Sequence, residues 1–94
     1  MIDVARNEDR QRYEIRVDGE RAGFALYEER PGRIVFTHTV VLPAFEGRGL
    51  GSRLARFALE DAVDRGLGVE LECPFMTAYV AKHPEFAEAV VAAD

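Results

Sequence analysis

The stretch VVLPAFEGRGLGSRLARFALEDA, residues 40–62, decides the expected fold. Its β-branched run ends at Pro43, which cannot donate a hydrogen bond to a sheet ladder. Three glycines then alternate, at Gly47, Gly49 and Gly51, and the apolar residues after them recur with a helical period. Such a loop between a strand and a helix lets backbone N–H groups approach a ligand, and the helix dipole favours a phosphate there. A tight glycine-rich turn without a ligand is the alternative.

The helix after the glycines is expected over residues 52–65. Four apolar residues share one broad face of it: Leu54, Phe57, Ala58 and Ala62. Asp61 and Arg65 interrupt that face, so we expect the last turn to fray or to lie at the surface. Gly66 is expected to end the helix at the C′ position.

The first 42 residues have the pattern of antiparallel β structure. Period-two alternation predicts strands over 12–17 and 20–29, and two turn signals follow them: Asp18-Gly19 and Pro31-Gly32. In the second strand, three side chains are expected on one face: Ala22, Phe24 and Leu26. Residues 33–42 are apolar on both faces, which predicts a central strand.

Beyond the long helix, the pattern predicts a strand over 68–73, a short helix over 75–82 and a last helical segment over 85–93. A strand–helix–strand unit implies one parallel pairing in an otherwise antiparallel sheet. We therefore expect an α+β fold, a mostly antiparallel sheet with one parallel pairing and helices packed on it. At this length, residues 1–94 are expected to form a single domain.

Composition and charge narrow the classes of function. The 12 Lys and Arg residues against 17 Asp and Glu give a net charge of −5, which argues against sequence-independent nucleic-acid binding. No apolar run approaches a membrane span, no signal-peptide pattern begins the chain, and no spacing suggests a metal site. The single cysteine fits a reducing cytoplasm. We expect a cytoplasmic monomer or weak homodimer without a nucleic-acid, membrane or metal partner.

Two familiar phosphate motifs do not fit the glycine series. No lysine follows the glycines as a Walker loop requires, and position 52 is Ser where the dinucleotide fingerprint has its third glycine. The pattern V-x-P-x-x-x-G-x-G-x-G over 41–51 instead resembles the acetyl-CoA signature of the GNAT acetyltransferase superfamily. More narrowly, HTVVLPAFEGRGLGSRL followed by ELECPFMTAYVAKHPEF is similar to a group of very small acetyltransferase-like proteins.

This resemblance implies a minimal GNAT fold with acetyl-CoA as cosubstrate. The residues that it assigns to cofactor binding are Val41, Glu46, Gly47, Arg48, Gly49, Leu50, Gly51, Ser52 and Arg53. Glu46 departs from the superfamily pattern, which has Gln or Arg there, so Arg48 and Arg53 are the available counter-charges. The hairpin from Val17 to Glu20 replaces the two helices with which most relatives wall the acceptor site, so an open acceptor side is expected.

The resemblance also suggests catalytic roles, each with a structural alternative. The backbone N–H of Val41 is the expected donor to the thioester carbonyl, and Tyr79 is either the general acid for the CoA thiolate or a core residue. Cys73 is either a small buried hydrophobe or a nucleophile that carries an acetyl group, and we favour direct transfer. His38 is either a proton acceptor or a half-buried residue that shares a face with Ile34, Phe36, Val40 and Leu42.

These expectations favour an N-acetyltransferase that acts on a small amine or an exposed lysine. A module that binds CoA or acetyl-CoA with little or no catalysis is the second reading, because the acceptor wall is missing. A non-enzymatic interaction protein is the third.

Overall fold

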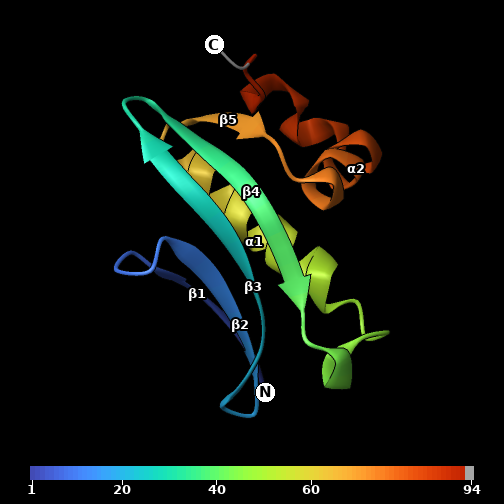
Figure 1. Cartoon of the computed structure of the whole chain (residues 1–94). Helices are drawn as coiled ribbons and strands as arrows, with labels where there is room; N and C mark the ends of the chain where they lie inside the picture. The colour runs from blue at the N-terminus through green and yellow to red at the C-terminus, as the bar shows by residue number, and fades with distance from the viewer. Residues whose placement is uncertain (93–94) are drawn as a thin grey trace.

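The computed structural model describes residues 1–92, which form a five-stranded sheet with helices packed against one face (Figure 1). In chain order the elements are β1 (Ile2–Asn7), β2 (Arg12–Val17), β3 (Glu20–Arg30), β4 (Arg33–Val41), the 3₁₀ helix η1 (Pro43–Phe45), α1 (Leu50–Asp64), β5 (Gly68–Leu71), α2 (Pro74–Lys82) and the 3₁₀ helix η2 (Pro84–Ala89). Within these residues, no helix is both long and apolar enough to cross a membrane.

The sheet has the predicted mixed topology. Its strands follow the order β1-β2-β3-β4-β5, the first three pairings are antiparallel, and β4 pairs in parallel with β5. The central position of β4 and the α+β fold are thereby confirmed. The connection from β2 to β3 is the predicted hairpin, in which Asp18 and Gly19 have φ of 51° and 84°.

Two register shifts make predicted strand faces wrong. Ile15 pairs with Gly23 and Arg16 with Arg21, so Ala22 is an extra residue that joins the core, while Phe24 and Leu26 lie half-buried outside it. A second bulge displaces Thr37, because Tyr27 pairs with Phe36 and Leu26 with His38.

The second bulge moves His38 away from the predicted face. Ile34 and Phe36 are fully buried, whereas His38 is exposed. An extra residue reverses the alternation of a strand, so His38 does not share the buried face of Ile34 and Phe36 as predicted.

Helix α1 differs from the prediction at both ends. It begins at Leu50, two residues earlier than expected, and Phe57 is 37% exposed rather than part of the buried face. It ends at Asp64, and its last turn lies at the surface, as one of the two predicted alternatives had it, with Val63 and Asp64 exposed. The turn is anchored there, because Asp61 accepts a 2.7 Å hydrogen bond from the Tyr13 hydroxyl and Arg65 pairs with Glu29.

The end of α1 confirms the predicted stop signal. Gly66 has φ of 72° and donates to the Val63 carbonyl, and Leu67 donates to the Ala62 carbonyl. This pair of hydrogen bonds is a Schellman motif, which glycine at C′ favours.

The C-terminal part is less helical than predicted. Strand β5 ends at Leu71 instead of 73, and α2 begins at Pro74 instead of 75. The last segment is a 3₁₀ helix that ends at Ala89, and Val90 then bridges to Val69 beside the sheet. The predicted end of this helix at 93 lies outside the described residues.

The core lies between the sheet and the two helices. Leu54, Ala58 and Ala62 of α1 meet Tyr13 and Phe36 of the sheet, and α2 adds Met76, Tyr79 and Val80. Within residues 1–92, no helix covers the opposite face of β2, β3 and β4 (Figure 1).

Candidate functional site

The three glycines of the loop have two different structural roles. Gly47 and Gly49 have φ of 81° and 71°, a region that side chains rarely adopt, and a Cβ on either would meet no atom within 4 Å. Gly51 lies in α1, where a Cβ would stand 2.9 Å from the Phe75 ring of α2. Gly47 and Gly49 therefore leave an open backbone loop before α1, which we call the cradle. Gly51 lets α2 pack against α1.

The cradle leads into the N-terminus of α1. Gly49 is the N-cap, no side chain caps the helix, and its first turn holds no acidic residue. The first hydrogen bond of the helix joins the Arg53 N–H to the Gly49 carbonyl at 3.3 Å. The N–H groups of residues 50–52 thus have no carbonyl of the helix to bind, and together with the helix dipole they suit an anion.

Strand β4 presents an unpaired edge to this cradle. Its parallel partner β5 pairs only with residues 33–36, and the Glu72 and Cys73 N–H groups close that pairing on the Phe36 carbonyl. On the other side, the Leu42 N–H donates to Ala22 of β3 at 2.8 Å. Because successive N–H groups of a strand point in opposite directions, the Val41 N–H points to the open edge.

Two adjoining hollows extend from this edge. The loop hollow, of about 250 Å³, is lined by Val41, Phe45, Glu46, Gly47, Gly49, Leu50, Gly51, Ser52 and Phe75. The inter-helix hollow, of about 120 Å³, is lined by Ser52, Phe75, Ala78, Tyr79, Lys82 and His83. Ser52 and Phe75 border both. A larger hollow of about 860 Å³ lies between β1 and α1, away from the glycines.

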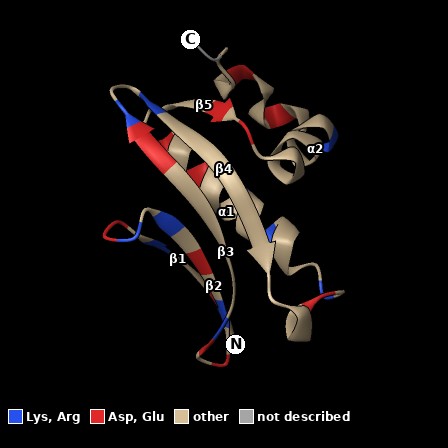
Figure 2. Cartoon of the chain, in the orientation of Figure 1, with Lys and Arg blue, Asp and Glu red and all other residues tan. Residues whose placement is uncertain are grey.

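Seven of the nine predicted cofactor residues line the loop hollow, and Arg48 and Arg53 do not. Arg48 instead lies 5.5 Å from the centre of the Phe45 ring, and the loop holds acidic and basic residues close together (Figure 2). The sequence reasoning missed Phe45 and Phe75. Phe45 stands directly before the glycine loop, where an aromatic residue was a usable signal, but no pattern around Phe75 indicated that it packs against Gly51 of α1.

Cys73 lies next to β4 rather than in the open. It is 3% exposed, it is the N-cap of α2, and its Sγ is 3.3 Å from Oγ1 of Thr39. Thr39 precedes Val41 by two residues and was not predicted. The period of a strand, which places residues i and i+2 on one face, was the signal that pointed to it.

Tyr79 lines the inter-helix hollow, and His83 contacts both its ring and its backbone carbonyl. Its ring stacks on His83 with centroids 3.9 Å apart, and its carbonyl lies 2.8 Å from Nδ1 of His83. The electrostatic interaction with Tyr79 is the largest cause that raises the pKa of Arg56. Burial of Arg56 lowers this pKa, and its hydrogen bond to Glu85 raises it further. The Tyr79 side chain is 6% exposed, and its position beside the hollow is compatible with either predicted role.

The predicted catalytic residues do not form one cluster. Cys73 adjoins Thr39 on β4, Tyr79 faces α1, and His38 lies on the sheet face opposite to Thr39. Among residues 1–92, no three His, Cys, Asp or Glu side chains gather as a metal ion would require.

Known proteins resemble this chain both in sequence and in fold. Residues 12–89 match the sequence profile of the GCN5-related N-acetyl-transferase family. The chain belongs to this family. Among its relatives in the family, Protein NATD1 of chicken and of human are each 36% identical over 86 residues, which is 88% of this chain and 77% and 75% of theirs.

Solved structures show the same GCN5-related fold. A GCN5-like putative N-acetyltransferase from Staphylococcus aureus superimposes with a TM-score of 0.71 at 18% identity, over 98% of this chain and 90% of that one. A ribosomal-protein-alanine N-acetyltransferase from Brucella melitensis superimposes with a TM-score of 0.59 at 21% identity, over 88% and 62%. Family and fold are therefore established together.

Proposed function

We propose that this chain is an acetyl-CoA-dependent N-acetyltransferase that moves an acetyl group to a small amine or an exposed lysine. The observation that carries the proposal is the cradle of Gly47 and Gly49, which leads into the uncapped N-terminus of α1 beside the open edge of β4. A pyrophosphate suits this cradle because the backbone at the two glycines is open to close approach and the N–H groups of residues 50–52 have no carbonyl of the helix to bind. The Gly49→Val experiment described in the Discussion tests this assignment.

In this proposal the first task of the chain is to bind acetyl-CoA and to orient its thioester. The N–H groups of residues 47–52 hold the pyrophosphate, with Arg48 and Arg53 close enough in sequence to add positive charge, and Glu46 opposes them as the one acidic side chain of the loop. The Val41 N–H donates to the thioester carbonyl oxygen, where negative charge develops during acyl transfer. Acetyl-CoA supplies the activated acetyl group when bound.

The second task of the chain is to accept a proton from the amine and to donate one to the departing sulfur. An amine attacks only when it is neutral, and the departing sulfur needs a proton, which we assign to the Tyr79 hydroxyl. The His38 side chain is exposed on β4 and available to accept a proton from the incoming amine. The uncovered face of β2, β3 and β4 suits an acceptor that is itself large or loosely held.

That open face also favours a second candidate, a module that binds CoA without efficient catalysis. A catalyst gains much of its rate from holding both reactants in place, and the acceptor has little wall to hold it here. The release of free thiol from acetyl-CoA in the presence of primary amines separates the two. A protein that binds acetyl-CoA but releases no thiol with any amine is the binding module.

We expect the acetyl group to pass directly from acetyl-CoA to the amine, without a covalent intermediate on Cys73. The thiol is buried against Thr39, and no basic side chain of the described residues forms a hydrogen bond with it. Cys73→Ala is therefore expected to keep its turnover, and intact-protein mass spectrometry after brief incubation with acetyl-CoA should show no adduct that hydroxylamine removes. A hydroxylamine-sensitive adduct that maps to Cys73, clears on addition of an amine and vanishes in Cys73→Ser would contradict direct transfer.

A further inference from the structure

The chain contains a single lysine. Of the 12 basic residues, only Lys82 is a lysine and the others are arginine. A guanidinium stays protonated in proteins and does not attack a thioester, whereas an amine does when it loses its proton. Apart from the N-terminal amine, Lys82 is thus the one amine that the chain offers to an acetyl donor.

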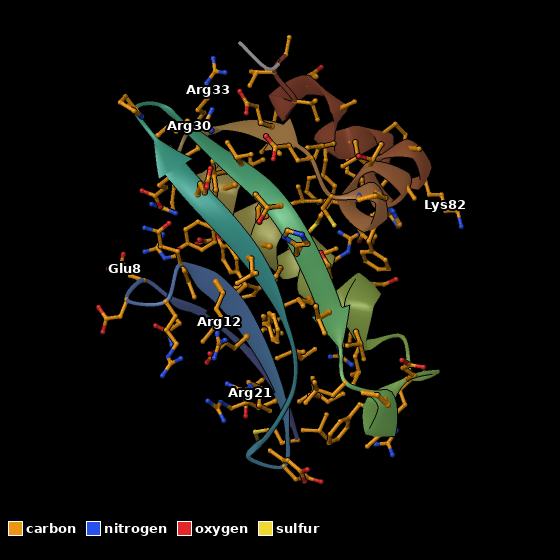
Figure 3. The ribbon with its side chains drawn as sticks, viewed as in Figure 1. Glu8, Arg12, Arg21, Arg30, Arg33 and Lys82 are labelled. Carbon is orange, nitrogen blue, oxygen red and sulfur yellow. The ribbon has the colours of Figure 1, made fainter. Side chains whose placement is uncertain are left out.

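This lysine lies beside the proposed cofactor site. It is the last residue of α2, it lines the inter-helix hollow, and Ser52 and Phe75 join that hollow to the loop hollow. Lys82 is exposed and forms no ion pair in the part of the chain that the structure describes. In Figure 3 its side chain extends outward from α2, free to swing on a four-carbon stem.

The same hollow offers a proton acceptor and a proton donor. The Tyr79 carbonyl can only accept a hydrogen bond, so Nδ1 of His83 carries the hydrogen at 2.8 Å, and Nε2 of the neutral ring keeps its lone pair. The Tyr79 ring stacks on His83 and lines the same hollow, and its hydroxyl group carries a proton that can be donated. The last turn of α2 and its C-cap residue therefore supply all three groups: the proton donor Tyr79, the nucleophile Lys82 and the proton acceptor His83.

We propose that Lys82 is a site of self-acetylation. This inference rests on the proposed use of acetyl-CoA. The neutral Nζ of Lys82 attacks the thioester carbonyl carbon, a C–N bond forms, and the C–S bond breaks. The sulfur leaves with the electron pair and takes a proton from Tyr79, while the proton lost by the amine passes to His83, and exchange with water restores both side chains. The products are an N-acetyl-lysine and CoA, and the net charge of the chain changes from −5 to −6.

The test is to incubate the full chain with acetyl-CoA and no other amine, strip thioesters with hydroxylamine, and follow the intact mass and the peptide map. We expect one stable acetyl group on Lys82, formed at a first-order rate that does not depend on protein concentration. Lys82→Arg should stay unmodified at this position, and isoelectric focusing should show the charge loss only in the wild type.

A matched control measures ordinary chemical acetylation. Arg21 is exposed at the far end of the molecule from Lys82 (Figure 3), so Arg21→Lys adds a second lysine that lines neither the loop hollow nor the inter-helix hollow. Lys82 is expected to react at least about tenfold faster than the introduced lysine, because proximity accelerates it. In a protein that also carries Gly49→Val, the two rates should become equal.

Equal rates without Gly49→Val, or a rate that rises with protein concentration, would overturn the inference. If Lys82 stays unmodified while calorimetry shows acetyl-CoA binding and a small amine is acetylated, self-acetylation fails and the proposed function stands. If acetyl-CoA does not bind, the proposed function fails as well. A label on the N-terminal amine alone, which pairs with Asp18, would also refute the assignment to Lys82.

Discussion

Gly49→Val is expected to weaken CoA binding at least about 100-fold, measured by isothermal titration calorimetry. Gly49 is the N-cap of α1 with φ of 71°, and a side chain there projects into the open cradle. A valine both resists this backbone conformation and occupies the space that a pyrophosphate needs. Charge-assisted hydrogen bonds contribute about 1.5–3 kcal/mol each, so the loss of two of them suffices for this effect.

A matched variant separates binding from backbone strain. Gly32 in the β3–β4 turn has φ of 77°, and a Cβ there would also meet no atom within 4 Å. Gly32→Val should therefore lose about the same stability, on the order of 1–2 kcal/mol, and keep its affinity for CoA. A folded Gly49→Val protein with unchanged CoA affinity would remove the basis of the cofactor assignment.

Tyr79→Phe is expected to lower kcat by about 10²–10⁴, the usual range for a positioned acid, with little change in CoA affinity. The substitution removes only the hydroxyl, so the stack on His83 and the contact with Phe86 remain. Steady-state release of free thiol from acetyl-CoA gives kcat, and calorimetry gives the affinity.

Tyr13→Phe is the control for the loss of a buried hydroxyl. Tyr13 is fully buried and donates to Asp61, away from both hollows. Because the hydroxyl donates to a carboxylate, its variant should lose about 1.5–3 kcal/mol of stability and keep kcat. Normal turnover in Tyr79→Phe would instead assign this tyrosine to the core, the alternative that the sequence left open.

The sequence predicted those parts of the fold that local patterns control. Asp18-Gly19 specified the β2–β3 hairpin, Gly66 the end of α1, and the strand–helix–strand order the parallel pair. The bulges at Ala22 and Thr37 were not predictable, because a bulge is set by the register between two strands and leaves little trace in the period of one. The wrong face assigned to His38 follows from this.

The sequence predicted the site residues that are contiguous in the chain, but not those that reach the site from other helices and strands. The glycine series and Val41 were found because they are contiguous, and the start of α1 was misplaced because a glycine inside a helix, Gly51, lowers the helical signal. Thr39 and Phe75 belong to the site through contacts with Cys73 and Gly51 that join separate elements. Such contacts depend on tertiary packing, which single-sequence patterns do not contain.

The most direct test of the central claim is a titration of the ¹⁵N-labelled chain with acetyl-CoA, followed by two-dimensional NMR. Our account predicts that the largest amide shift changes fall on Val41 and on residues 46–53, and that Gly32 and the β1–β2 hairpin barely change. No shift change at millimolar acetyl-CoA, or changes confined to the uncovered face of β2, β3 and β4, would contradict it.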